Sequence, residues 1–250
     1  MNALFGSLTT EGLEESSDRL GGFSPLSTAI YSGNIKLAYA GQSTGGARNV
    51  TLVIDCDGQE HRETIYITNK KGENFFLNKQ DNSKKVPLPG FTTIDDLCLI
   101  VTGKPLAEQA TEEKVVNVYD ADAKREVPKS VPMLVDLLNQ QASFAILKIL
   151  ENKSEKDSNG NYVATAETRD TNSIDKVFHT ATMMTVVEAR QGADEPKFYQ
   201  SWDERNTGKV RDKRDIKDGA ASGNAGRPGA NSAAPKAGQQ SERKSLFANA

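Results

Sequence analysis

The chain has very few of the residues from which most catalytic and metal sites are built. Its 250 residues include two histidines, two cysteines and one tryptophan. His61 and His179 each stand alone in a predicted strand or loop, where a histidine is more often a packing or surface residue than a base. Cys56 and Cys98 have no Cys/His arrangement with structural-zinc spacing. The composition therefore argues against a zinc site and against histidine-based catalysis.

Motifs of catalysis and phosphate binding are missing as well. The sequence contains no Gly-x-Ser-x-Gly elbow and no His-Glu-x-x-His pattern. Residues 102–104, Thr-Gly-Lys, lack the earlier glycine of a phosphate loop because Cys98 stands at that position, so Gly103 is interpreted as a helix stop. The acidic pairs at 55–57 and 120–122 do not continue into a calcium-loop ligand pattern. We expect a protein that is not an enzyme and binds no metal or cofactor.

Long apolar runs are also absent. No run approaches the length that crosses a bilayer, and the amino terminus lacks the charged-then-apolar pattern of a signal peptide. Cys56 and Cys98 both lie in apolar periodic runs, which favours buried thiols in a reducing compartment over a disulfide. These features predict a cytoplasmic protein that does not enter a membrane.

Charge is distributed unevenly along the chain. Residues 201–250 are rich in Gly, Ala, Ser, Asn and Lys, a composition that predicts a flexible, disordered tail. This segment has ten basic and six acidic residues, a net +4, so the rest carries −7 of the overall −3. An acidic domain is a poor general binder of polyanions, so any nucleic-acid site must be a local basic patch. One such patch lies between residues 69 and 85, with Lys70, Lys71, Lys79, Lys84 and Lys85 against Glu73 and Asp81.

Alternating apolar residues predict a run of antiparallel strands in the first half. Ile35, Leu37 and Tyr39 alternate, as do the apolar residues of 50–56. Asp57-Gly58 tolerates the positive φ of a tight hairpin turn, and 61–68 is the return strand. The prolines of 87–91 exclude regular structure there. A helix with Thr92 or Thr93 as its N-cap and Gly103 as its stop then follows.

The second half is again rich in strand signals. The pattern predicts a hairpin from 114–120 and 127–131, a short helix over 132–140, and strands at 143–151, 162–168, 174–178 and 183–187. We expect an all-β to α+β fold, of which a five-stranded Greek-key barrel with one or two short helices is the simplest member. The predicted organisation is an N-terminal arm over 1–30, partly ordered, a binding domain over 31–200, and a flexible tail over 201–250.

The stretch 62–79 combines a strand with a basic, amide-rich, aromatic loop. In a strand Ile65 and Ile67 point to one side, while Arg62, Thr64, Tyr66 and Thr68 point to the other. Rings that stack under bases and cations that follow phosphates are what hold a single strand of nucleic acid. The same alternation is typical of any half-solvated strand, so this stretch alone does not decide between the two.

Four segments together resemble the single-stranded DNA-binding proteins of tailed bacteriophages. They are the turn at 43–47, Ser-Thr-Gly-Gly-Ala; the run 63–74, Glu-Thr-Ile-Tyr-Ile-Thr-Asn-Lys-Lys-Gly-Glu-Asn; the segment 88–91, Leu-Pro-Gly-Phe; and Leu97-Cys98-Leu99 before Thr102-Gly103-Lys104. The similarity covers roughly residues 35–188. It implies an oligonucleotide/oligosaccharide-binding (OB) barrel that coats single-stranded DNA during replication, recombination and repair in the cytoplasm of the infected bacterial host.

The resemblance and the residue pattern together predict a site without turnover. Tyr66, Phe75 and Phe76 would stack on bases, although one of two adjacent aromatics is commonly core. Phosphates would be neutralised by five cations and contacted by two amides: Arg48, Arg62, Lys70, Lys71 and Lys79, with Asn69 and Asn74. The alternative is a non-catalytic phage structural or scaffold protein with the same small barrel.

Two terminal segments are candidates for protein contacts. The family's tails often end in an acidic stretch, whereas this tail is basic and places Leu246 and Phe247 near the end. The pair is either a docking tip for replication or recombination proteins or a frayed end. The weak helical pattern before residue 22 would dock on a neighbouring subunit, giving self-association, or on the chain's own basic site, or form a lightly packed terminus.

Overall fold

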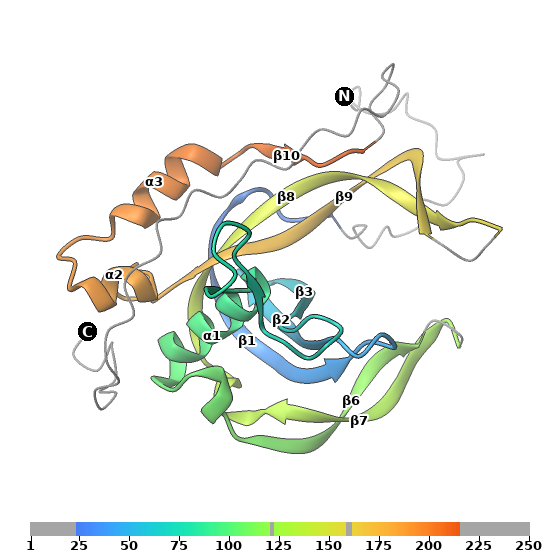
Figure 1. The fold of residues 1–250 in the computed structure, drawn as a ribbon, viewed down its shortest axis with the longest axis horizontal. Helices are drawn as coiled ribbons and strands as arrows, with labels where there is room; N and C mark the ends of the chain where they lie inside the picture. Colours follow the sequence, from blue (N-terminus) through green and yellow to red (C-terminus); the bar gives the residue numbers. More distant parts are fainter. Residues whose placement is uncertain (1–23, 121–122, 159–161, 216–250) are drawn as a thin grey trace, which may run out of the picture.

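The computed structural model describes residues 24–215 except 121–122 and 159–161, and these residues are mainly β (Figure 1). The strands are β1 (Ala29–Gln42), β2 (Arg48–Cys56), β3 (Gln59–Tyr66), β4 (Phe75–Leu77), β5 (Lys85–Pro87), β6 (Thr111–Asp120), β7 (Arg125–Leu134), β8 (Gln141–Lys156), β9 (Tyr162–Phe178) and β10 (Val210–Asp212). The helices are α1 (Pro89–Thr102), α2 (Val186–Gln191) and α3 (Lys197–Asn206), with 3-10 turns at Leu106–Glu108 and Val135–Leu137. The expected mainly β class is confirmed.

The predicted meander forms. β1, β2 and β3 pair antiparallel in chain order, and the turn between β2 and β3 has φ of 52° at Asp57 and 87° at Gly58. Positive φ at both central residues is what an Asp-Gly hairpin turn provides. Val50, Leu52, Ile54 and Cys56 are all nearly fully buried, as their alternation predicts.

One detail of β1 differs from the sequence pattern. Its register against β2 shifts between Ile35 and Leu37, the signature of a β-bulge. An extra residue reverses which side the following side chains take. Ile35 therefore lies in the main core, whereas Leu37 and Tyr39 pack on the opposite face against the β6–β7 hairpin. The expectation that these three residues share one face is wrong.

The sheet does not close into a barrel through backbone hydrogen bonds. Strand neighbours run β9-β8-β1-β2-β3, and in the described part of the chain no ladder joins β3 to β9. A side chain spans this opening instead. The Glu63 carboxylate on β3 accepts hydrogen bonds from the Ile174 amide (2.7 Å) and the Ser173 hydroxyl (3.0 Å) on β9.

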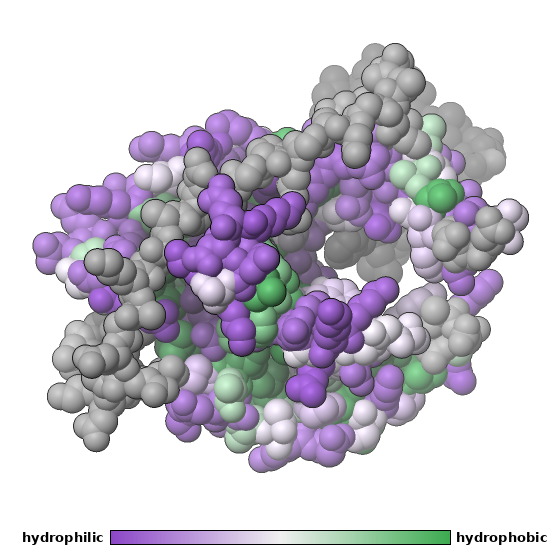
Figure 2. All heavy atoms as spheres, in the orientation of Figure 1, coloured by the Kyte–Doolittle hydropathy of each residue, from purple (hydrophilic) through white to green (hydrophobic). Residues whose placement is uncertain are grey.

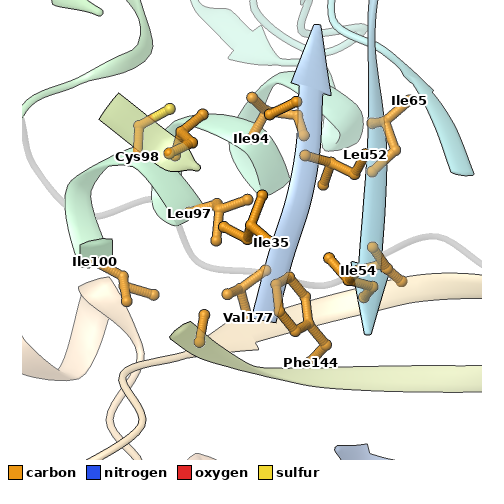
Figure 3. Close-up of a cluster of buried hydrophobic side chains, with 14 of the residues drawn as sticks. Ile35, Leu52, Ile54, Ile65, Ile94, Leu97, Cys98, Ile100, Phe144 and Val177 are labelled. Carbon is orange, nitrogen blue, oxygen red and sulfur yellow. The ribbon is translucent and has the colours of Figure 1, made fainter. Parts of the chain in front are cut away.

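Helix α1 covers the inner face of the sheet. Figure 3 shows Ile94, Leu97 and Cys98 of α1 meeting Ile35 and Leu52 of the strands in one apolar cluster. These residues are at most 1% exposed. Full burial of each such aliphatic side chain stabilises the fold by roughly 1.5–3 kcal/mol. The core therefore fixes the position of α1 relative to β3.

The helix begins earlier than predicted. Its first residue is Pro89, and Leu88 occupies the N-cap without a side-chain cap. Proline is well suited to the first helical position because its φ is already helical and its missing N–H would have no partner there. Thr92 and Thr93 instead donate their hydroxyls to carbonyls one turn back. The exclusion of regular structure from 87–91 was wrong, whereas the stop at Gly103, with φ of 72°, is confirmed.

The second half contains three further differences. Strand β7 continues to Leu134, so the predicted helix over 132–140 is reduced to a single 3-10 turn, Val135–Leu137. The strands predicted at 162–168 and 174–178 are one long strand, β9, because β8 pairs along it. The predicted strand at 183–187 runs into α2, since Thr185 and Glu188 form a capping box that starts a helix.

Ordered structure continues past the predicted boundary at residue 200. Helix α3 crosses that boundary, and its Trp202 is 4% exposed and donates from Nε1 to Asp175 (2.7 Å). Strand β10 then pairs in parallel with β8. The Gly- and Ala-rich part of 201–250 therefore lies after α3 and β10 and does not begin at residue 201. Residues 216–250 and 1–23, with most of the predicted tail and arm, lie outside the described residues.

We predict that both cysteines are unreactive in the folded protein. Burial raises the pKa of Cys56 and of Cys98 to about 12, and the thiolate is the reactive form. A thiol reagent at neutral pH should therefore label neither residue until a denaturant unfolds the chain. A Val187→Cys variant, at a position that is 44% exposed, is the positive control. Rapid labelling of the folded wild type would contradict the buried placement.

A second prediction concerns the ion pair between α1 and β9. Lys176 Nζ lies 3.0 Å from Asp96 Oδ2, and burial raises the pKa of Asp96. Lys176→Met leaves a buried carboxylate without this partner, which should cost about 3 kcal/mol in free energy of unfolding at neutral pH. Because the fold then favours the protonated acid, the loss should shrink as the pH falls towards the ordinary aspartate pKa.

Urea unfolding at neutral and at mildly acid pH measures both effects. Lys148→Met is the matched control, because its partner Asp170 is 37% exposed and such pairs contribute little. The control should lose under about 1 kcal/mol with little dependence on pH. Equal losses in the two variants would show that the Asp96 site is not special.

Candidate nucleic-acid interface

The outer face of β3 presents the residues that the alternation predicts. Arg62, Thr64 and Tyr66 are exposed, whereas Ile65 is 8% exposed and belongs to the core. The Tyr66 ring is 52% exposed. Thr68 differs from the prediction: it follows the end of β3, is 8% exposed, and its hydroxyl accepts from the Arg48 amide (2.8 Å). The exposed face made by Arg62, Thr64 and Tyr66, called the platform below, therefore ends at Tyr66.

Two loops meet at the end of β3 that carries Tyr66. The Ile67 amide donates to the Arg48 carbonyl (3.0 Å), which ties the segment after β3 to the start of β2. The turn at 43–47 lies against Lys70, because a Cβ built on Gly45 would be 3.4 Å from Lys70 Cε. Tyr66 pairs with Asn49, the residue after Arg48. The fold thus gathers Arg48, Tyr66 and Lys70, which are far apart in sequence, at one end of the sheet.

The loop 69–73 is shaped by Asn69. Its amide oxygen accepts from the backbone N–H groups of Lys71 and Glu73, and its amide nitrogen donates to the Glu73 carboxylate. Gly72 supplies the positive φ that this turn needs. Asn69 is therefore engaged in holding the loop, and its predicted role as a sugar or phosphate ligand receives no support from this geometry. Asn74 is half-buried at the end of the loop.

Phe75, Phe76 and Lys79 lie on a different structural unit. β4 and β5 form a separate two-stranded sheet between β3 and α1. Lys85 Nζ lies 4.3 Å from the centroid of the half-buried Phe75 ring, so one face of that ring already has a cation. Phe76 is 47% exposed, and Lys79 is exposed. Phe76 is thus the more accessible member of the aromatic pair.

The cations predicted for phosphate binding are unpaired in the part of the chain that the structure describes. Arg48, Arg62, Lys70, Lys71 and Lys79 form no ion pair there, in contrast to Lys84, which pairs with Asp81 (3.1 Å). In Figure 2 the loops between β3 and α1 present a mainly hydrophilic surface with apolar residues beneath. Cations without an internal partner are available to an external anion.

A cleft of about 780 Å³ borders Tyr66 and lies between β3, the start of α1, β9 and β10. It contains three carboxylates, those of Glu63, Asp175 and Asp212, and two cations, Arg211 and Lys213. Each carboxylate has a hydrogen-bond partner within the protein: Glu63 on β9, Asp175 at Trp202, and Asp212 at Arg214. The balance of charge in this cleft is unfavourable for phosphates. The end of the sheet with Arg48 and Lys70 is more favourable for an anion.

Sequence reasoning missed Arg211 and Lys213 as neighbours of Tyr66. Both were assigned to a disordered tail, because the composition of 201–250 was averaged over its whole length. The strand itself carries no alternation signal, because Val210, Arg211 and Asp212 are all exposed. The signal that could have found them is the amphipathic segment around Trp202 just before it.

Comparison with known proteins does not identify this chain. No protein-family model matches it. A search of curated proteins finds no match either. Within the described residues, no group of three or more metal-ligating side chains occurs, and no helix is long and apolar enough to cross a membrane.

A glycine contact fixes the position of Tyr66 and generates a prediction. Gly90 in the first turn of α1 lies so close to β3 that an added Cβ would be 2.2 Å from the Tyr66 carbonyl oxygen. Gly90→Ala must move α1 away from β3, and we expect a loss of roughly 1–3 kcal/mol in free energy of unfolding, measured in urea. At Gly45 an added Cβ meets only ordinary contacts, so Gly45→Ala should be nearly neutral. Equal stability of the two variants would show that the α1 contact is loose.

Proposed function

We propose that this protein binds single-stranded DNA without strong sequence preference and coats it during phage DNA replication, recombination and repair, in the cytoplasm of the infected host. The observation that carries the proposal is the half-exposed Tyr66 ring at the end of the sheet that also holds the unpaired Arg48 and Lys70, with Arg62 further along the same face of β3. An exposed ring supplies stacking, which is tolerant of sequence because every base has a flat face. Binding is stoichiometric, with no chemical turnover.

The strand order supports the finer fold assignment that goes with this function. An OB-fold is a partly open, five-stranded Greek-key barrel whose second and third strands face the oligonucleotide. Here the neighbours run β3-β2-β1-β8-β9. In chain order β3 and β8 are the third and fourth of these five strands, and α1 lies between them. The β6–β7 hairpin is then an insertion after α1, and the Glu63 bridge spans the open seam. Tyr66 and Arg62 lie on the third strand.

The contacts of the predicted residues suggest a different role for each group of them. Tyr66 and Phe76 stack on bases, and Arg48, Arg62, Lys70, Lys71 and Lys79 neutralise phosphates. Asn74 remains a candidate sugar or phosphate contact, whereas Asn69 acts by shaping the loop that carries Lys70 and Lys71. Leu246 and Phe247, outside the described residues, are proposed to contact replication or recombination proteins through apolar surface.

We predict that the full chain binds a fluorescently labelled poly-dT oligonucleotide at low salt, which raises the fluorescence anisotropy of the label. Tyr66→Ala should weaken binding by roughly 1–3 kcal/mol, which is about 5- to 150-fold. The double variant Lys70→Ala/Lys71→Ala should reduce the slope of log K against log salt by about 1.4, because each neutralised phosphate of a single strand contributes roughly 0.7.

A charge-matched control separates the site from the overall field. Lys104 and Lys197 are also exposed and form no ion pair among the residues described. Lys104→Ala/Lys197→Ala changes the net charge equally and should leave the salt slope unchanged. Failure of the wild type to bind poly-dT at low salt would favour the alternative, a structural or scaffold protein.

A further inference from the structure

Strand β6 is an open edge of the main sheet. It pairs with β7 and with no other described strand, and the β6–β7 hairpin lies along the lower rim of the molecule in Figure 1. Its ten residues contain no proline, no glycine and no bulge. Val115 is 72% exposed and Tyr119 is 61% exposed. Proteins usually protect such an edge, because its free backbone groups are a template for another strand.

The prolines of β7 reveal which backbone groups of β6 point outwards. Pro128 lies opposite Asn117, and Pro132 lies opposite Glu113. Proline has no N–H to donate, so it occupies pairs in which the backbone groups of both residues point away from each other. Alternate residues of β6 therefore direct their N–H and C=O groups to the free side. They are Thr111, Glu113, Val115, Asn117 and Tyr119, and the last three include both large apolar residues of β6 that are exposed.

The last three of these residues, Val115, Asn117 and Tyr119, are spaced symmetrically about Asn117. If a second β6 approaches antiparallel with Asn117 opposite Asn117, each Val115 lies opposite the other copy's Tyr119. All three pairs then join residues whose backbone groups point outwards, so each pair can form two hydrogen bonds. Pairs of an aromatic and a β-branched residue are among those that stabilise antiparallel sheets. The most exposed apolar residues of β6 thus cover each other.

The neighbouring symmetric register is poorer. Centred on Val115, it places Glu113 opposite Asn117 and Thr111 opposite Tyr119. Val115 then lies opposite its own copy, but Tyr119 gains no apolar partner. The register centred on Asn117 also places the half-buried Val116 opposite Val118 on the other face. The pattern of side chains selects one alignment.

We propose that two copies of this chain associate through β6, antiparallel about Asn117, so that their two sheets become continuous. A two-fold contact of this kind uses the same surface of both copies and closes on itself, which limits the assembly to a dimer at this edge. The proposal depends on the β6–β7 hairpin alone and is independent of whether the Tyr66 surface binds DNA.

Cross-linking through a new cysteine tests the alignment directly. In the proposed dimer the two copies of residue 117 have Cα atoms about 5.5 Å apart, which suits a disulfide, whereas the two copies of residue 115 are separated by about four strand residues. Asn117→Cys should form a disulfide-linked dimer on mild oxidation, and Val115→Cys should not. Both natural cysteines are buried and do not interfere. An Asn117→Cys chain that stays monomeric, or equal cross-linking of both variants, would overturn the proposal.

A pair of charge variants tests the same alignment without a covalent bond. In Val115→Lys/Tyr119→Lys, like charges lie opposite each other across the contact, whereas in Val115→Glu/Tyr119→Lys the charges are complementary. Sedimentation equilibrium should show a dimer for the wild type and for the complementary variant, and a dissociation constant roughly tenfold or more higher for the like-charge variant. A wild type that is monomeric at every concentration, or identical behaviour of the two variants, would refute the β6 dimer.

Discussion

The carboxylate of Glu63 joins the two ends of the sheet, and the arrangement around Tyr66 depends on it. Glu63 accepts from the Ile174 amide, the Ser173 hydroxyl and the His61 ring, so three donors from two strands meet on one side chain. Backbone groups at an unpaired strand edge must find other partners, and a carboxylate acceptor gives hydrogen bonds stronger than neutral ones. Because Glu63 lies three residues before Tyr66, the closure that holds β9 also fixes the platform.

Helix α1 also holds β3 and β9 together, on the core side of the sheet. Its apolar side packs on β3 and β9, Gly90 touches the Tyr66 carbonyl, and Asp96 pairs with Lys176 of β9. The helix therefore bridges the same two strands as Glu63, on the core side rather than at the seam. With both contacts in place, the outer face of β3 needs no further covering layer, and its polar side chains stay accessible.

Much of the first half could be predicted from the sequence because its signals are local. The Asp57-Gly58 turn, the alternation of β2 and β3, and the glycine stop of α1 each depend on residues within a few positions of one another. The exposed Arg62 and Tyr66 follow from the same alternation. The features that could not be predicted are non-local: the bulge after Ile35 turns Leu37 and Tyr39 towards a hairpin that lies some 80 to 100 residues later in the chain.

The strand predicted at 183–187 and the tail predicted from 201 both went against a signal that was present in the sequence. Thr185 and Glu188 have capping-box spacing, but the apolar run around them suggested a strand. Trp202 lies in a segment whose composition suggested disorder, although a lone tryptophan with periodic neighbours favours docking. The grouping of Arg48, Lys70 and Tyr66 required the pairing of β2 with β3 to be known in register, and register was only implied by the turn. The separation of Phe75 from the Tyr66 sheet had no sequence signal.

The uneven charge has a physical consequence for the proposed ligand. Residues 1–200 carry a net −7, and the cleft beside Tyr66 adds carboxylates at close range, so a rigid duplex with two charged backbones would meet repulsion over most of its contact area. A single strand is flexible enough to follow only the cations near Arg48 and Lys70 while its bases reach the ring of Tyr66. The acidic surroundings would thus contribute to selectivity for single strands, because they penalise the binding of a partner that cannot bend away from them.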